Sequence, residues 1–535
     1  MIKERKGITL IALVITIIVL LILAGVSISM LTGDNGILTQ AGKTKEENIK
    51  GQEKEQIQLA MQSLKIEKES KNLPILVAPD ELQNQLISDG VQNVTVEDRE
   101  NNNLMVKYQD SKNSYIVDQN GNIRENGKFE EELVEQPENV AKYWEVTRIS
   151  DIDWYSYNDI SNGDKKAKVN TPKLSGNMRP IKYIGAEADT QKGSKWANAM
   201  TADGSMFVWI PRYAYKITEG YHTNVAGTIE VAFLDTNNNF LNGETGTLTV
   251  NPEEEGAGTT KWLVHPVFTS NAEYGGGFGE IPGIWVGKFE TTGEYSDGNA
   301  SKVSVKPGVK NLGNMTINDQ YKAGIKATFG ENINLNSHMA KNSEWGATVY
   351  LAHSKYGINK QEIEKNVSSS FYTGGTSKIE EIYTTNRKQS TTHNATGVYD
   401  LNGGAWERTA AYLNNGDNSL KEVAGEENGD LYGKTVQEQS TSTKYKTVYN
   451  SINNQGEDYQ ATEKRNKGEA IFETSGEYRD TEGAWFNSYT DFPFDEIVFF
   501  MRGGNAIDLK KGGFSFRRSN GLAYDTGTFR IILID

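Results

Sequence analysis

The feature that most constrains this chain is a long stretch near its N-terminus that has no charged residue. It runs from Gly7 to Gly33 and consists mostly of Ile, Leu, Val and Ala. A helix needs about 20 apolar residues to cross the hydrocarbon core of a bilayer, so the sequence predicts a transmembrane helix over residues 8–32. The segment before it, 1–6, has a net positive charge, which holds that end in the cytoplasm. We therefore expect a single-pass protein of the cell membrane with an extracellular C-terminal domain.

The start of the apolar stretch carries a second signal. The string Lys6-Gly7-Ile8-Thr9-Leu10-Ile11 resembles the leader of type IV pilin-like proteins, in which a prepilin peptidase cuts after a Gly. The resemblance implies a leader over residues 1–7, cleavage between Gly7 and Ile8, and a pilus-like surface location with prepilin peptidase and other pilins as partners. Ala12 stands where the family usually has the Glu tied to assembly, so polymerisation stays open. A plain signal anchor is the alternative; a cleaved secretory signal fits less well, because the stretch is too long.

The rest of the 535 residues is too long for one core and predicts more than one domain. Residues 43–127 predict a stalk helix rich in Lys, Glu and Gln, followed by a small pilin-like α+β unit of short strands. Residues 128–140 are acidic and predict a linker. Residues 141–535 predict one large, loop-rich domain with a polar insertion at about 414–478. The expected fold class is thus α+β, with a transmembrane, pilin-like long helix and a small antiparallel sheet preceding the large domain.

Composition excludes several classes of function. Asp and Glu number 71 against 56 Lys and Arg, a net charge of −15, so we expect no nucleic-acid partner. The chain has no Cys, which excludes disulfides and thiol nucleophiles, and its five His are scattered without metal-ligand spacing. The segment Asp235–Asn239 begins like a calcium loop, but Phe240 and Gly246 stand where such a loop needs Gly and Glu. We therefore predict no metal and no cofactor, with a structural calcium ion of unidentified ligands left open.

Six short blocks follow one another in the second half of the chain: Phe207–Pro211, Trp285–Thr292, Ser343–Trp345, Asn402–Glu407, Arg502–Gly504 and Thr528–Arg530. Their order resembles the formylglycine-generating enzyme (sulfatase-modifying factor) superfamily, which implies a C-type-lectin-like fold for residues 141–535. The blocks carry the structural motif residues Trp209, Glu290, Glu344, Trp345, Asn402, Trp406, Glu407, Arg502, Gly503, Gly504, Phe529 and Arg530. We expect the tryptophans to pack in the core and Arg502, Arg530 and Glu407 to form a buried ion-pair network.

The chain lacks the metal-binding residues that enzymes of that superfamily use. Formylglycine-generating enzymes hold copper through cysteines, which are absent here, and other relatives use metal-bound His that none of the five His matches. We therefore expect no enzyme activity and a domain that binds. If Phe514 and Phe516 face the core, alternation sends Ser515 and Arg517 to the opposite face. The predicted ligand-binding residues are Asn505, Asp508, Lys510, Arg517, Arg518 and Tyr524.

The resemblance extends to variable proteins diversified by retroelements, whose C-terminal strands of this fold carry the changing residues. One sequence does not show variation, so diversification stays open here. The sequence as a whole predicts a bacterial, surface-anchored recognition protein whose partner is an extracellular ligand or a cell-surface partner. Two alternatives remain: a minor pilin that acts as a structural pilus subunit, and a divergent enzyme that acts on envelope or glycan substrates.

Overall fold

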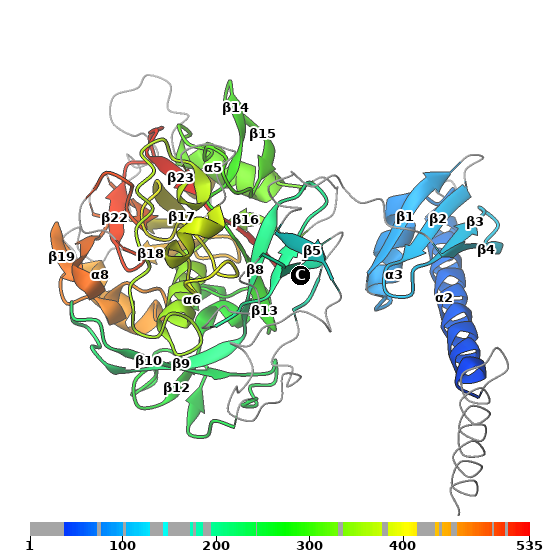
Figure 1. The fold of residues 1–535 in the computed structure, drawn as a ribbon, viewed down its shortest axis with the longest axis horizontal. Coiled ribbons are helices and arrows are strands. Elements are labelled where there is room, and N and C mark those ends of the chain that lie inside the picture. The colour runs from blue at the N-terminus through cyan, green and yellow to red at the C-terminus, as the bar shows by residue number, and fades with distance from the viewer. Residues whose placement is uncertain are drawn as a thin grey trace, which may run out of the picture. The chain divides into compact units, whose positions relative to one another are not determined.

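The computed structural model describes residues 37–71, 76–91, 93–99, 103–128, 143–147, 172–174, 178–185, 194–241, 243–329, 335–376, 383–414, 434–437, 441–450, 457–494, 497–508 and 512–534 (Figure 1). These residues form six α-helices and twenty-four strands, so the fold is mixed and contains mostly strands. The chain divides into two compact units, residues 1–132 and 133–535. Each unit has a hydrophobic core of its own.

The first unit packs two helices on a four-stranded antiparallel sheet. Its elements are α2 (Ile37–Ser70), α3 (Pro79–Ser88), β1 (Val94–Arg99), β2 (Asn103–Tyr108), β3 (Asn113–Val117) and β4 (Ile123–Lys128), with the strands in the order β1-β2-β3-β4. Ile57, Ala60, Met61 and Leu64 are buried on α2. Their spacing places them on one face of the helix, where they form the core with the strands.

The predicted fold class included a membrane-spanning N-terminal helix, and helix α2, the first helix that the structure describes, does not have that character. Beyond its buried face α2 exposes Lys, Glu and Gln, whose transfer into hydrocarbon would be costly. In the described ranges no helix combines the length and the apolar character needed to cross a bilayer. This finding corrects the predictions of a transmembrane fold and a single-pass location in the cell membrane. The leader 1–7, the span 8–32 and the Gly7/Ile8 junction lie outside the described residues.

The second unit contains a seven-stranded sheet in which all pairs are antiparallel, in the order β16-β24-β13-β8-β7-β6-β5. The strands are β5 (Trp144–Val146), β6 (Arg179–Tyr183), β7 (Asn198–Met200), β8 (Met206–Pro211), β13 (Gly283–Gly287), β16 (His338–Met339) and β24 (Ile531–Leu533). The last strand of the chain, β24, therefore lies inside the sheet between β13 and β16, so both ends of the described part of this unit belong to one sheet.

A second seven-stranded sheet runs in the order β18-β17-β21-β22-β20-β19, and β23 pairs with β17. The strands are β17 (Trp406–Asn414), β18 (Thr447–Asn450), β19 (Thr481–Ala484), β20 (Ser488–Asp491), β21 (Phe499–Arg502), β22 (Phe516–Ser519) and β23 (Gly527–Phe529). It is mixed, because β18 and β23 run parallel to β17 and β20 runs parallel to β22. Two of the six residues that the sequence predicts to bind a ligand, Arg517 and Arg518, lie on β22 of this sheet.

Two smaller β-structures and four helices complete the second unit. A four-stranded sheet has the order β10-β9-β12-β11, and β14 pairs with β15 in a hairpin. The bounds are β9 (Tyr213–Glu219), β10 (Thr228–Phe233), β11 (Leu248–Thr249), β12 (Trp262–Val264), β14 (Thr292–Ser296), β15 (Asn299–Ser304), α5 (Ile317–Lys326), α6 (Asn342–His353), α7 (Lys434–Gln437) and α8 (Glu457–Arg465). Short 3-10 helices occupy Pro266–Phe268, Ala272–Tyr274, Thr373–Gly375, Tyr383–Gln389, Phe472–Thr474 and Trp485–Asn487.

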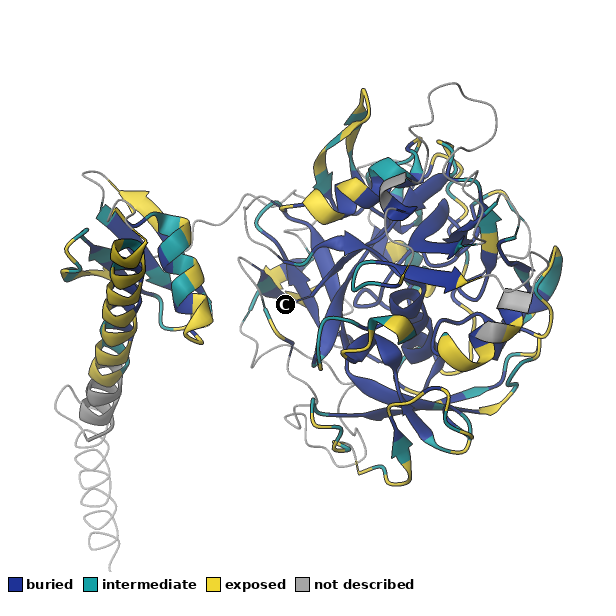
Figure 2. Ribbon diagram, turned by 180° about the vertical axis from the view of Figure 1, so that it is seen from behind, coloured by how far each residue is buried: buried dark blue, intermediate teal, exposed yellow. Residues whose placement is uncertain are grey.

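The core of this unit lies around α6, all of whose residues are buried (Figure 2). The tryptophans of the motif blocks belong to it: Trp209 and Trp285 lie with their ring centroids 5.1 Å apart, and Trp345 and Trp406 are also buried. The described part of segment 414–478 joins this structure, because β18 pairs with β17 and Tyr449 packs against Phe500. The predicted linker beyond Lys128 lies outside the described residues.

Candidate functional site

Arg530 and Glu407 form a buried ion pair that holds the C-terminal strand. The Arg530 Nε donates to Glu407 Oε2 at 2.9 Å, and Nη2 contacts Oε1. Nη1 and Nη2 also donate to the carbonyl oxygens of Gly287 and Tyr399, at 2.7 and 2.9 Å. Burial raises the pKa of Glu407 to about 7, and Arg530 opposes that shift. The pair therefore ties β24 to β13 and β17 in the interior, where no ligand can reach it.

Glu290 and Asp400 are two further buried carboxyl groups beside this pair. Glu290 accepts hydrogen bonds from the Ala405 N–H at 2.7 Å and from Asn311 Nδ2 at 2.6 Å. Burial raises the pKa of Glu290 well above its ordinary value, and the neighbouring Asp400 and Glu407 raise it further. Burial likewise raises the pKa of Asp400. Of these three carboxyl groups, Glu407 contacts the Arg530 guanidinium, and the charge of Arg530 opposes the rise in the pKa of Asp400. Burial and the mutual repulsion of the carboxylates favour protonation of Glu290.

Arg502 does not join that network, contrary to the expectation from the sequence. Its Nε donates to the Ser515 carbonyl at 2.9 Å, and Nη1 and Nη2 donate to the carbonyls of Glu469 and Ala470 at 2.9 and 2.8 Å. The side chain of Arg502 is therefore buried and links β21 to the backbone at Ser515 and at Glu469–Ala470. Next to it Gly503 has φ +81°, and a Cβ there would stand 3.1 Å from Leu401 O. Gly504 also has a positive φ, so both glycines are required by the backbone.

The other motif residues have structural contacts. Glu344 caps α6 by accepting from the Lys341 N–H at 2.7 Å, and its Oε1 lies 2.8 Å from His338 Nε2. Burial raises the pKa of Glu344, but His338 and Lys341 outweigh burial and hold it below its ordinary value. Asn402 Nδ2 donates to the Ile363 carbonyl at 2.6 Å, and Phe529 is buried.

The predicted ligand-binding residues separate into exposed and structural groups. Arg517 and Tyr524 are exposed, and Arg518 is partly exposed. Asn505 is buried and its Oδ1 accepts from the N–H groups of Ile507 and Asp508, at 3.0 and 2.8 Å. That geometry makes Asn505 a turn residue rather than a ligand contact. Lys510 lies outside the described residues.

The exposed group centres on strand β22, and we call the cluster around it the β22 patch. It comprises Arg479, Asp480, Tyr489, Phe494, Arg517 and Arg518. The guanidinium carbons of Arg518 and Arg479 lie over the ring of Phe494, 3.9 and 4.3 Å from its centroid. Tyr489 donates its hydroxyl to Asp480 Oδ1. Such cation–π contacts attract the guanidinium groups to the ring face and hold them in place.

Asp508 and Arg517 both interact with Trp406 at the edge of the patch. Trp406 Nε1 donates to Asp508 Oδ2 at 2.9 Å, and the guanidinium carbon of Arg517 lies 5.8 Å from the ring of Trp406. Tyr524 instead donates to Asn520 Oδ1 at 3.0 Å and lies over Arg408. The structure therefore brings together Asp508, Arg517 and Arg518, three of the six predicted residues.

Asp491 is the buried counter-ion of the patch. Its Oδ2 lies 3.0 Å from Arg518 Nε, and the side chain of Asp491 is almost fully buried. Burial raises the pKa of Asp491, while Arg518 and Arg517 lower it. Among the described residues its Oδ1 has no hydrogen-bond partner. Arg518 is therefore both a surface group and the partner of a buried charge.

Sequence reasoning missed Arg479 and Phe494. Both lie in loops of the segment that precedes β21, and they meet Arg518 only because β22 is placed beside β20. The aromatic pair Phe492-Pro493-Phe494 was the one available signal, because an apolar ring in a Pro-containing loop needs a partner. Nothing in the sequence identifies that partner as two arginines.

Histidines and acidic loops in the described residues supply no metal site. In those ranges, no three His, Asp or Glu side chains are placed to hold a metal ion. Asp235 accepts hydrogen bonds from the N–H groups of Asn237 and Asn239, at 2.9 and 2.8 Å, the geometry of an Asn-rich turn. Burial lowers the pKa of His265 to about 3 and that of His353 to about 4, so both are neutral and unsuited to proton transfer near neutral pH.

No protein-family model matches this chain, and no curated protein sequence matches it. The interpretation of the site therefore depends on the geometry of the β22 patch and on the motifs of the chain itself.

Proposed function

We propose that this chain is a recognition protein, that its large unit is a non-catalytic, sulfatase-modifying-factor-like domain, and that the β22 patch is its binding surface. The observation that carries the proposal is the pair of guanidinium groups, from Arg479 and Arg518, over the ring of the partly exposed Phe494. Arginine and aromatic side chains dominate the energetics of binding surfaces, because they combine a large contact area with hydrogen-bond donors. The order of the six motif blocks supports the assignment of the domain.

The chemistry of these groups suits binding better than catalysis. Arginine stays protonated at neutral pH, so it can neither abstract a proton nor act as a nucleophile. A planar guanidinium presents paired N–H donors that match a carboxylate. The three arginines of the patch lie near three aspartates, Asp480, Asp491 and Asp508, but Asp491 is buried and Asp508 already accepts a hydrogen bond from Trp406 Nε1. We therefore propose a partner that presents carboxylate groups to Arg479, Arg517 and Arg518.

The scaffold under the patch is rigid, as a binding surface requires. Phe516 on β22 and Ser515 just before it are buried, and the rings of Phe492 and Phe500 pack together with their centroids 5.2 Å apart. Residues held by such packing lose little side-chain freedom when a partner binds, and this preserves affinity.

The test uses immobilised probes whose chemistry is known. Poly-glutamate and polygalacturonate present carboxylates from a peptide and from a glycan, and a Gly-Ser peptide and dextran are their neutral counterparts. We expect the wild-type chain to be retained by at least one carboxylate probe and by neither neutral probe. Arg517→Ala should weaken retention about tenfold, whereas Arg124→Ala, an exposed arginine of the first unit, should leave it unchanged. Equal retention of wild type and Arg517→Ala would refute the proposal.

A further inference from the structure

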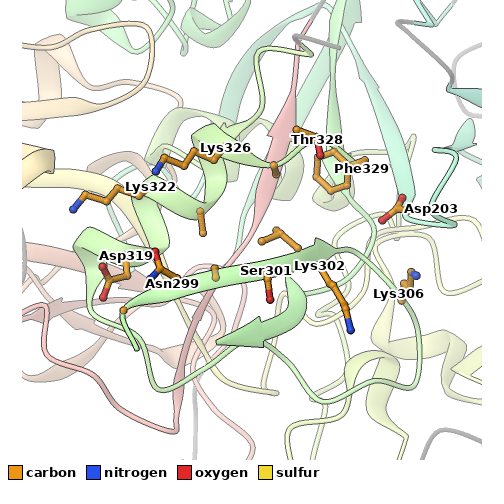
Figure 3. A pocket seen from close by; sticks show the side chains of 15 residues that line it. Asp203, Asn299, Ser301, Lys302, Lys306, Asp319, Lys322, Lys326, Thr328 and Phe329 are labelled. Atoms are coloured by element: carbon orange, nitrogen blue, oxygen red, sulfur yellow. The ribbon is translucent and has the colours of Figure 1, made fainter. Parts of the chain in front are cut away.

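We propose that a second site, the lysine-lined cavity between the β14–β15 hairpin and α5, binds a small molecule that carries phosphate groups. The cavity has a volume of about 490 Å³, which is within the range of sites for small ligands. Four of its lining residues are lysines: Lys302, Lys306, Lys322 and Lys326 (Figure 3). It is distinct from the β22 patch, so this inference does not depend on the proposed function.

The lysines come from two elements that the fold brings together. Lys322 and Lys326 are four residues apart on α5 and therefore share one face of the helix. Lys302 belongs to β15 and Lys306 follows that strand. Figure 3 shows the first pair extending from the helix and the second pair from the strand side of the cavity. A chain with a net charge of −15 thus has four lysines in the lining of one cavity.

The acidic residues of the lining are already engaged. Asp319 Oδ2 accepts from the hydroxyls of Tyr295 and Thr316, at 2.6 and 2.8 Å. Asp203 accepts from the Thr201 hydroxyl at 2.6 Å and from the Ser205 hydroxyl at 2.9 Å. Both carboxylates are therefore hydrogen-bonded to nearby hydroxyl groups, and among the described residues neither forms an ion pair with a lysine of the lining.

The lysines, in contrast, are largely unpaired. Within the part of the chain that the structure describes, Lys306, Lys322 and Lys326 have no ion-pair partner. Lys302 pairs with Glu294 at 2.8 Å, but both side chains are well exposed, and such surface pairs are weak. The four lysines of the lining outnumber its two carboxylates, Asp203 and Asp319, so the lining has a net positive charge.

Two residues of the lining have backbone conformations that a non-glycine residue rarely adopts. Lys302 has φ 50° and the buried Phe329 has φ 49°, which is unfavourable, above all for a bulky aromatic residue. Phe329 is held there by an edge-to-face contact with Phe207, whose ring centroid is 5.2 Å away. Backbone strain that packing maintains is typical of ligand sites, so the strain agrees with a preformed cavity.

The side chains indicate phosphate rather than carboxylate as the ligand group. Lysine binds phosphate as a point charge, without the planar match that arginine makes with carboxylates. Ser301 and Thr328 add hydroxyl groups, and Asn299 adds an amide. A cavity of about 490 Å³ with four lysines accommodates more than one phosphate group. We therefore expect a small organic molecule with two or more phosphates.

The test is isothermal titration calorimetry of the full chain with inorganic tripolyphosphate at constant ionic strength. We expect saturable binding of one tripolyphosphate per chain, weakened at least tenfold in the double variant Lys322→Gln/Lys326→Gln. Lys310→Gln is the matched control, since Lys310 is exposed in the same region but does not line the cavity. Absence of saturable binding, or equal affinity in the double variant, would overturn the proposal. Thermal melts of the free proteins should coincide, because the substituted lysines are exposed; a large loss of melting temperature in the double variant would assign these lysines to stability instead.

Discussion

At the scale of single residues, buried ionisable side chains should control how the stability of the second unit depends on pH. Glu407, Glu469, Glu473 and Arg502 are all buried, and an isolated buried charge is costly. Glu407 is paired with Arg530, whereas Glu469, Glu473 and Arg502 are held mainly by hydrogen bonds to uncharged groups. Arg502, for example, donates to three carbonyl groups. The stability of this unit should therefore depend on the protonation of its buried carboxyl groups.

Glu469 allows that dependence to be measured. Burial raises its pKa to about 7, and the hydroxyl of Tyr449 and the amide of Asn466 offset this only in part. A carboxyl group whose pKa is raised on folding stabilises the fold below its unfolded pKa of about 4.5, and that contribution is lost as the pH rises to about 7. Glu469→Gln has no charge but keeps an acceptor for Tyr449. We expect the variant to gain stability relative to wild type between pH 5 and pH 8, by an amount on the order of 3 kcal/mol. Urea denaturation of both proteins at pH 5 and pH 8 gives their free energies of unfolding. If the difference between variant and wild type were the same at the two pH values, the prediction would be wrong.

The Arg518–Asp491 pair leads to a second prediction at this scale. Sequence reasoning alone expects Arg518→Ala to leave stability unchanged, but the structure shows that this substitution leaves Asp491 buried without its cation. We expect a loss of about 1–3 kcal/mol in the free energy of unfolding, because Arg518 is itself partly exposed. Adding Asp491→Asn removes the unpaired charge and should restore part of the loss. A double variant no more stable than Arg518→Ala would show that the pair is not the cause.

At the scale of elements, strand β22 separates scaffold from surface. Phe516 is buried and Arg517 is exposed, as alternation along a strand requires. Ser515, which the sequence also predicts on the surface, is buried instead, because it lies before the strand begins and its hydroxyl accepts from the Gly512 N–H at 2.9 Å. Alternation is a reliable guide only inside a strand, and the sequence does not locate the end of the strand.

Two substitutions in β22 test this separation. Phe516→Ala removes a fully buried ring that packs against Phe492 and should cost about 3–5 kcal/mol of stability. Arg517→Ala should change stability by less than about 1 kcal/mol, since Arg517 is exposed and the buried Asp491 keeps its ion pair with Arg518. Thermal and urea unfolding of both variants provide the comparison. If Phe516→Ala and Arg517→Ala lost similar amounts of stability, Arg517 would be part of the scaffold and not of the surface.

Local sequence patterns predicted individual helices and strands, but they did not predict which distant segments would pair or contact one another. The sequence predicts a helix over Ser343–Ser354, and the structure has α6 at Asn342–His353. It also predicts short strands in the first unit near β1 to β4. It does not predict β18, because that strand lies in a polar segment and its partner β17 is more than thirty residues earlier in the chain. Only two of the six residues of the β22 patch were predicted, for the same reason: Arg517 and Arg518 are neighbours on one strand, whereas Arg479 and Phe494 come from earlier loops that the sheet places beside them.

At the scale of the whole molecule, the two units have separate cores, each built from residues of its own unit. A unit with a complete core is expected to fold alone. Residues 141–535, expressed by themselves, should therefore show a cooperative thermal transition within a few degrees of the corresponding transition in the full chain. Addition of EDTA should leave that transition in place. A molten state, or a fall of tens of degrees with EDTA, would show that the fold needs residues 1–140 or a metal ion.

The most direct test of the account is the affinity of the β22 patch for the carboxylate probe that retains the wild-type chain. Arg479→Ala and Arg517→Ala should each raise the dissociation constant roughly tenfold, with melting temperatures close to that of wild type. Arg124→Ala and the Lys322→Gln/Lys326→Gln variant should bind this probe as wild type does, because they change other surfaces. If instead the lysine variant loses affinity while the arginine variants keep it, the carboxylates bind at the lysine-lined cavity and the β22 patch is not the recognition surface.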